Sequence, residues 1–458
     1  MNVKIVQDNS RTERNVSDDV VEILYQETKN YETHDNSKLI GSIEINRGYS
    51  DAVEFLNRNY SNLTISTKFE SYIRFEDPIV EQLILDRFST LDTPVGDGIG
   101  ITQSDLNSIN QGWFWDTFQN TEITKFNEFK LCINYKNLSS ASFKNCTKLE
   151  EINLTNIEII SVASCLQNTK IKEAYLPNLT KITAGNIFYN CTELESFNAP
   201  LLEQITGASH FYNCTSLKTI NIPIFNGRIS ESMFRNCSSL ETLNIGNITE
   251  IVGSYAFLGC KELSSIDLSE CTKIQSDSVF NGCSSLTNLG DTSNITYFNG
   301  TWTFFNCSNL TGTLDLSNIS NDFNLTGTFN NCSNLTKIKL GVTNTIGSRW
   351  HGFDNDRKAF YGCTNLVTID IKQLNHTALE YKSAFGNNPA LRNFIIRNTE
   401  NIPAFDNEQT TVNINCFGGS NVKVYVDDNL LETYKTTEGW EDMIDYLYPI
   451  SEYVPIED

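Results

Sequence analysis

The chain has few of the residues and motifs on which most enzymes depend. Its 458 residues include four histidines, His34, His210, His351 and His376, and none lies at a spacing typical of metal ligands. It contains no Gly-x-Ser-x-Gly motif, no phosphate-binding loop and no paired-carboxylate motif. Carboxylates are too numerous to exclude a glycosidase pair by counting alone. Even so, we expect no catalytic residues, no metal ion and no cofactor.

Basic residues and long apolar runs are also scarce. The chain has 34 Lys and Arg against 56 Asp and Glu, a formal net charge of −22. Nucleic-acid backbones attract Lys and Arg, so this balance predicts no nucleic-acid binding. No run of about 20 apolar residues is present, so membrane insertion is not expected. The segment after Met1 lacks the apolar stretch of a secretory leader, which favours a protein that reaches the outside without one.

Cysteine is plentiful, but the close pairs that metal sites use are missing. The chain has 13 cysteines and no Cys-x-x-Cys. Nine of them belong to a repeated Phe-x-x-Cys-x-x-Leu unit and are Cys146, Cys191, Cys214, Cys237, Cys260, Cys283, Cys307, Cys332 and Cys363. The spacing is 23 residues from Cys191 through Cys283 and then lengthens to 24, 25 and 31. We therefore predict a column of buried, reduced thiols, one in each turn of a repeat structure.

Each unit leads into a short apolar alternation such as Ile220-x-Ile222, which has the period of a β-strand. One strand per repeat predicts parallel pairing along one face, with the Phe side chains filling the space between layers. Serines before the Phe, as in Ser254, Ser276 and Ser383, predict short helical turns with a Ser cap. The expected fold is an α/β solenoid with a parallel β-sheet face and about 23 residues per repeat.

The repeat also resembles a known family. The string Ile-x-Leu-Pro-x-Leu-x-x-Ile-x-x-x-x-Phe-x-x-Cys-x-x-Leu, most complete at residues 174–194 and 220–240, is similar to the BspA-like (Treponema-type) leucine-rich repeats of gut Bacteroidetes and their phages. The resemblance covers roughly residues 137–396. Residues 73–129 and 422–450 resemble the entry and closing segments of such proteins. The resemblance implies a leucine-rich-repeat solenoid that serves adhesion or surface recognition without catalysis.

These patterns predict four parts: an N-terminal attachment domain at 1–70, an entry or capping segment at 71–136, the solenoid at 137–420, and a C-terminal cap with an acidic tail at 421–458. The last part has ten Asp and Glu against two Lys, which we interpret as a solubilising tail. The first part should be a small α+β domain. We expect a helix from Ser17, a strand at 39–45 and a helix at 51–60.

The stretch from Asp92 to Asp105 is rich in Asp and Gly and invites comparison with a calcium-binding loop. Counted from Asp92, the third, fifth and twelfth positions are Pro94, Gly96 and Gln103, which do not supply the required ligands. We therefore predict a turn followed by a helix capped near Thr102.

A ligand would contact the outward side chains of the strands, which are short, polar and nearly free of aromatic residues. Two interpretations remain open: an amide and hydroxyl ladder that stabilises the stack, or a shallow polar face for a glycan or protein. The candidate ligand-binding residues on this face are Asn221, Asn244 and Asp267. Aromatic candidates come from longer repeats: Trp302, and Trp350, His351 and Phe353 in the loop at 347–357.

The function expected from these observations is that of a phage virion appendage, on the head or the tail, made in the host cytoplasm. Its partners would be other virion proteins, contacted through the N-terminal domain, and a host-surface glycan or protein. Either a monomer or an oligomer is compatible with the sequence. The alternative is a Bacteroidetes cell-surface adhesin whose leader is absent from the sequence, and a third class is an intracellular scaffold.

Overall fold

Two units of the chain are distinguishable in the computed structural model: residues 1–110 with 131–134, and residues 111–130 with 135–458. The structure describes residues 2–7, 20–25, 41–45, 63–67, 72–89, 100–109, 117–138, 143–321, 325–343, 358–377, 387–405 and 421–455. The four-part division expected from the sequence stays a prediction.

The first unit begins with two pairs of parallel strands. β1 (Asn2–Gln7) pairs with β2 (Val20–Tyr25), and β3 (Gly41–Ile45) pairs with β4 (Leu63–Thr67). β3 confirms the predicted strand, whereas β2 shows that the helix predicted from Ser17 is wrong. Its β-branched residues, such as Val20 and Val21, are stiff side chains that favour a strand over a helix. The helix predicted at 51–60 lies outside the described residues.

Two helices follow in the same unit, α2 (Pro78–Ser89) and α3 (Gln103–Ser108). Thr102 accepts a hydrogen bond from the Asp105 amide while the Asp105 carboxylate accepts one from the Thr102 amide. This reciprocal capping box confirms the predicted helix start near Thr102. The preceding stretch with the calcium-like pattern, residues 92–99, lies outside the described residues.

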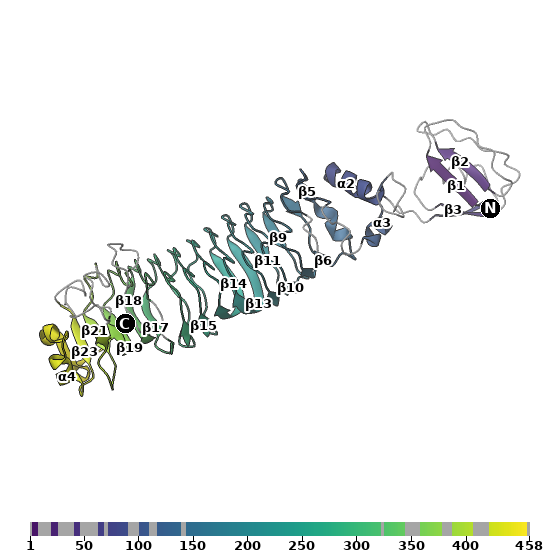
Figure 1. The fold of residues 1–458 in the computed structure, drawn as a ribbon. Coiled ribbons are helices and arrows are strands. Elements are labelled where there is room, and N and C mark those ends of the chain that lie inside the picture. The colour runs from purple at the N-terminus through teal and green to yellow at the C-terminus, as the bar shows by residue number, and fades with distance from the viewer. Residues whose placement is uncertain are drawn as a thin grey trace. The chain divides into compact units, whose positions relative to one another are not determined.

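The second unit is a solenoid of parallel strands (Figure 1). A strand follows the Leu of most Phe-x-x-Cys-x-x-Leu units, which confirms the predicted sheet face there. In the turns of Leu263 and Leu286 the pairing is reduced to an isolated parallel bridge between Ser265 and Asn288, so the strand predicted at Ile266-x-Leu268 is wrong. The strands of this face are β5 (Lys125–Phe126), β7 (Glu151–Ile152), β9 (Glu173–Tyr175), β11 (Ser196–Asn198), β13 (Thr219–Ile229), β14 (Thr242–Ile251), β17 (Gly312–Leu316), β18 (Leu335–Thr343), β19 (Thr368–Leu374), β21 (Asn393–Ile396), β23 (Lys423–Val426) and β24 (Leu447–Pro449).

A second series of short parallel strands lies later in each turn. Its members are β6 (Asn137–Leu138), β8 (Ile159–Ile160), β10 (Lys181–Ile182), β12 (Gln204–Ile205), β15 (Lys273–Ile274), β16 (Tyr297–Phe298), β20 (His376–Thr377) and β22 (Ala404–Phe405). The long strands β13 and β14 pair in both series, with register shifts between the two segments. The chain ends in α4 (Leu431–Thr436) and the 3-10 helices η5 (Glu441–Tyr446) and η6 (Ile450–Glu452); another, η2 (Asn127–Leu131), directly follows β5.

Stacked phenylalanine rings form the core between the turns. Phe211, Phe234 and Phe257 are buried, and consecutive ring centroids are 5.5 and 5.2 Å apart with interplanar angles of 1° and 17°. The stack continues in the same manner to Phe360. Because each ring contacts the rings above and below, a turn obtains its apolar contacts from its neighbours, as the repeat predicted.

The cysteines form a second buried column beside the rings. The Cys260 thiol donates a hydrogen bond to the Phe234 carbonyl of the preceding turn at 3.1 Å, and Cys283 does the same with Phe257 at 3.2 Å. The twelve cysteines within the described residues are free and buried. The predicted column of reduced thiols is confirmed, and each thiol also joins two turns through a weak hydrogen bond.

The segment before each Phe is not a helical turn, so the predicted Ser-capped helices are wrong in the described repeats. Tyr255 and Ser278, each two residues before its Phe, have φ values of 62° and 55°. The Phe257 amide donates to the Val279 carbonyl of the next turn at 2.8 Å. Backbone groups that a helix would pair locally are therefore paired between turns. Ser383 lies outside the described residues.

In two turns of the solenoid a threonine occupies the position of the cysteine by which the repeat was recognised. Thr121, three residues after Phe118, and Thr169, three residues after Leu166, occupy the cysteine position. The Thr121 hydroxyl lies 3.6 Å from the Cys146 sulfur, and that of Thr169 lies 3.3 Å from the Cys191 sulfur. A hydroxyl can therefore substitute for the thiol, which explains the gap between Cys146 and Cys191 in the sequence pattern.

We expect the nine repeat thiols to resist alkylation in the native protein. Burial raises the pKa of Cys191 to about 11 and that of Cys283 to about 12, so the reactive thiolate is scarce at neutral pH. Iodoacetamide labelling followed by peptide mass spectrometry should find these sites unmodified in buffer and fully modified in urea. Rapid native labelling of Cys260 would contradict the buried column.

Candidate functional site on the outward face of the sheet

The outward side chains of the first strand series form two parallel rows. In β13, Ile220 and Ile222 are buried while Thr219 and Asn221 point outward. The strand register places Thr219 beside Ser196 and Thr242, and Asn221 beside Asn198 and Asn244. This is the period-2 alternation expected of a half-buried strand. The row that contains Asn221 is called the outer row below, and its members are Asn127, Asn153, Tyr175, Asn198, Asn221 and Asn244.

Amide side chains of the outer row are hydrogen-bonded to one another. Nδ2 of Asn244 donates to Oδ1 of Asn221 at 2.5 Å, and Nδ2 of Asn221 donates to Oδ1 of Asn198 at 2.8 Å. Asn221 and Asn244, two predicted ligand residues, thus join a ladder between turns. Asp267, the third, is exposed and accepts the Ser269 amide at 2.9 Å, which stabilises its own turn.

The ladder should contribute measurably to stability. Asn221→Ala removes two hydrogen bonds, so we expect the free energy of unfolding to fall by about 1–2 kcal/mol, with solvent compensating part of the loss. Urea denaturation followed by circular dichroism would measure the change. Thr219→Ala, at an exposed place on the same strand, is the matched control and should change stability by less than about 0.5 kcal/mol. Equal stability of the two variants would show that the ladder is energetically neutral.

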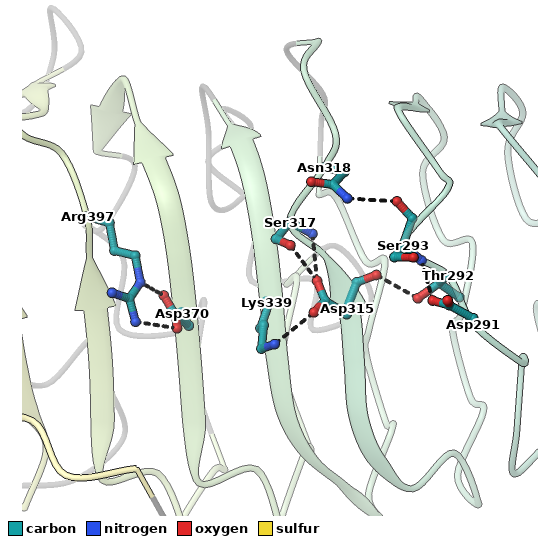
Figure 2. A network of polar contacts seen from close by, with 9 residues as sticks. All are labelled: Asp291, Thr292, Ser293, Asp315, Ser317, Asn318, Lys339, Asp370 and Arg397. Atoms are coloured by element: carbon teal, nitrogen blue, oxygen red, sulfur yellow. Dashed lines mark hydrogen bonds and ion pairs between the residues drawn. The ribbon is translucent and has the colours of Figure 1, made fainter. Parts of the chain in front are cut away.

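Towards the C-terminus the outward face carries paired charges instead of amides (Figure 2). Asp315 on β17 contacts Lys339 on β18 at 2.8 Å, and Asp370 on β19 contacts Arg397 through two hydrogen bonds of 2.6 and 2.9 Å. Partial burial raises the pKa of Asp315, but hydrogen bonds from Lys339 and Ser317 outweigh it and leave that pKa below its ordinary value. The charged groups of this stretch neutralise one another and fill one another's hydrogen-bonding capacity, so we interpret them as a ladder that stabilises the stack.

Near the other end of the series the outward face is hollowed. The hollow has a volume of about 420 Å³ and lies over β7, β9 and the start of η2. Its lining includes Asn127, Glu151, Asn153, Lys172, Glu173 and Tyr175. The strand ladder is interrupted here, because β7 pairs with β5 while β9 is the edge strand of the six-stranded sheet next to β11. The volume falls within the range of about 300–1,000 Å³ typical of small-ligand sites.

Tyr175 is the residue that sequence reasoning missed. It takes the place in the outer row that Asn occupies in the turns on either side, and it is 53% exposed. The outward face is therefore not simply free of aromatic residues. Aligning Glu173-Ala-Tyr175 with Ser196-Phe-Asn198 in the sequence would have placed Tyr175 in the outer row. That alignment was missed because this turn has Thr169 where other turns have the cysteine that marks the repeat.

The predicted aromatic candidates do not gather at this hollow. Trp302 is half-buried, has a φ of 51°, and sits two residues before Phe304, the same turn position as Ser278. Its amide donates to the Thr326 carbonyl at 2.9 Å, so its backbone belongs to a structural turn and not to the outward face. Trp350, His351 and Phe353 lie outside the described residues, and their proposed role in ligand binding stays a prediction.

Within the part of the chain that the structure describes, no group of three or more His, Cys, Asp or Glu residues is placed to hold a metal ion. None of the helices in these described residues has the length and apolar character needed to cross a membrane. His210 is buried and neither ring nitrogen has a hydrogen-bond partner. Burial lowers the pKa of His210 to about 4, partly opposed by the nearby backbone of Thr206 and Gly207.

Comparison with known proteins supports the repeat architecture. A family model described as the BspA type leucine rich repeat region matches residues 107–241, 227–355 and 326–426, and contains six copies of the repeat. No curated relative matches the chain.

Among solved structures, the chain is similar to a leucine-rich repeat protein from Bacteroides ovatus, with 19% identity, 62% of this chain and 87% of that chain covered, and a TM-score of 0.37. It is also similar to a leucine-rich repeat protein from Eubacterium ventriosum, with 17% identity, 63% and 82% covered, and a TM-score of 0.32.

Proposed function

This chain belongs to the BspA-type leucine-rich repeat family, and from that premise we propose that it is a non-enzymatic protein that attaches a larger body to a surface. The observation that carries the proposal is that the inward and outward side chains of each turn differ in character. The interior is filled by the ring and thiol columns, whereas the outward strand face presents hydrogen-bonding side chains over many successive turns. A solenoid of this kind offers an extended surface for recognition.

The proposal extends to a phage virion appendage, with the N-terminal domain at residues 1–70 as the contact to other virion proteins. The free, buried thiols support production in a reducing compartment such as the host cytoplasm, because secreted proteins of oxidising compartments commonly pair their cysteines. A bacterial cell-surface protein is the alternative, and the family supports it equally at the level of surface recognition.

Two measurements test the proposal at its two levels. The purified chain should bind intact host cells or their envelope fraction in a sedimentation assay, and failure to bind any envelope would remove the attachment function. Mass spectrometry across a density gradient of the native culture shows whether the protein belongs to a virion or to the bacterial cell surface. Co-migration with DNA-filled particles supports the virion, whereas recovery with the cell envelope contradicts it and favours the cell-surface alternative.

A further inference from the structure

We propose that the hollow beside Tyr175 binds a neutral saccharide, with the tyrosine ring as the platform for one sugar ring. This inference deepens the attachment function proposed above and rests on it. Its basis is the combination, within one cavity of about 420 Å³, of an exposed aromatic ring, carboxylates and amides.

The first argument is the exposure of Tyr175. Among the described residues it is the one aromatic side chain with a large exposed fraction, since the other large exposed side chains are aliphatic. An aromatic ring that stands in water beside a polar hollow offers an apolar face to the C–H groups of a sugar ring, and a phenol that can bond at its edge. By contrast, the amide groups of Asn221 and Asn244 in the outer row already donate to their ladder neighbours, Asn198 and Asn221.

The second argument is that Tyr175 interrupts the Asn ladder and leaves amide donors of neighbouring residues unused. Asn198 accepts from Asn221, but the next place towards the N-terminus is Tyr175, so Nδ2 of Asn198 has no amide to which it can donate. On the other side, Oδ1 of Asn153 accepts the amide and hydroxyl of Thr155, at 3.2 and 2.7 Å. These contacts use its oxygen and leave its Nδ2 available. Asn198 is beside Tyr175 in the strand register and Asn153 lines the same hollow, so two amide donors lie in the surroundings of the ring.

The third argument is the supply of acceptors. Glu151 lines the hollow and is held in place by Lys125 at 2.8 Å and Asn127 at 3.1 Å. Hydrogen bonds from these residues, first Lys125 and then Asn127, keep the pKa of Glu151 below its ordinary value, so it is ionised at neutral pH. Glu173 is exposed next to Tyr175 on the same strand. Sugar hydroxyls both donate and accept, so they can use carboxylates and amide donors together.

The charge of the hollow selects against other ligands. Its carboxylates, those of Glu150, Glu151 and Glu173, face two ammonium groups, with Lys172 lying 3.7 Å from Glu150 and Lys125 contacting Glu151. The balance of three negative charges against two positive charges leaves one negative charge. This net negative charge repels sialylated, sulfated and phosphorylated ligands. Because two of the carboxylates are already in ion pairs, the hollow has little attraction for a basic peptide. A neutral glycan fits this balance.

Tyr175→Asn is the decisive variant because it places in this turn the residue that the outer row otherwise carries. The change removes the ring but provides an amide able to continue the ladder, so we expect the melting temperature to be kept or raised. Tyr175→Trp retains an aromatic platform. Tyr297→Asn is the matched control, since Tyr297 is a partly exposed tyrosine on β16 that packs against Lys273, away from the hollow.

The full chain and these variants would be tested on an array of gluco-, galacto-, manno- and N-acetylhexosamine oligosaccharides, with sialylated and sulfated glycans and basic peptides alongside. Calorimetry would then measure Kd for the neutral oligosaccharide bound best. We expect binding to a neutral class that weakens by about tenfold or more in Tyr175→Asn and persists in Tyr175→Trp and Tyr297→Asn. Absence of neutral binding, binding confined to acidic glycans or peptides, or undiminished binding by Tyr175→Asn would each overturn the proposal.

The same variants separate this inference from the attachment function. If the wild-type chain sediments with host envelopes and Tyr175→Asn does so equally well, attachment stands and the saccharide site falls. If neutral oligosaccharides bind at Tyr175 but no envelope is bound, the site stands and the attachment function falls.

Discussion

Phe234→Ala is expected to lower the free energy of unfolding by about 3–5 kcal/mol. Phe234 is fully buried, and its ring contacts Phe211 and Phe257, with centroids 5.5 and 5.2 Å away. Truncation leaves a cavity between two turns and removes both ring contacts. In a structure whose turns are coupled only to their neighbours, it also weakens the link between the two halves of the stack. Urea denaturation monitored by circular dichroism would measure the loss and show whether the transition divides in two.

Phe234→Leu is the matched control. Leu166 occupies the equivalent position of an earlier turn and is buried there, so a leucine can fill this site. We expect a loss of only about 1–2 kcal/mol, because most of the volume is kept. Equal denaturation midpoints for the alanine and leucine variants would contradict the view that the ring column couples the turns.

Acidification should destabilise the solenoid through His210, with a loss of about 3 kcal/mol between pH 6.5 and pH 4. The folded-state pKa of about 4 lies below the ordinary value of 6.5, so in this window the unfolded chain binds the proton and the folded chain does not. The stabilising effect of the neutral ring is complete above pH 6.5 and is lost as the pH falls towards 4.

His210→Met separates this effect from the titration of carboxylates. Met233 holds the equivalent position in the next turn and is buried, so methionine suits the site. The variant should be more stable than the wild type at pH 5 and should show a smaller dependence of the melting temperature on pH. Identical pH profiles for the two proteins, measured by calorimetry from pH 4.5 to 7.5, would show that His210 is not the acid-sensitive group.

The sequence was most informative where one chemical requirement recurs. Phe257 and Cys260 fill spaces that recur from turn to turn, so the residue type repeats in most turns and the columns can be predicted. It was least informative where different residues meet the same requirement. Thr169 replaces a cysteine because a hydroxyl can occupy the same position against Cys191, and a pattern built on cysteine does not register that turn.

The same loss of alignment concealed the hollow. Without a cysteine to set the register, the place of Tyr175 in the outer row was not recognised, although its neighbours Asn198 and Asn221 were. The serines before each Phe were misleading for another reason. A Ser that precedes an apolar residue suits a helix cap, but here backbone groups such as the Phe257 amide are bonded to the next turn, an arrangement that sequence spacing alone does not reveal.

The side-chain hydrogen bonds of the cysteine column and of the Asn ladder run in one direction, and this makes the solenoid extensible. Cys283 donates to the turn before it, Asn244 donates to Asn221, and Asn221 donates to Asn198. An inserted copy of a 23-residue unit would therefore meet a matching acceptor on one side and a matching donor on the other. Each copy would add one ring spacing, such as the 5.3 Å between Phe257 and Phe280. Duplication or loss of one repeat unit would therefore change the length of the solenoid in fixed steps. The packing of the core would stay the same in every unit.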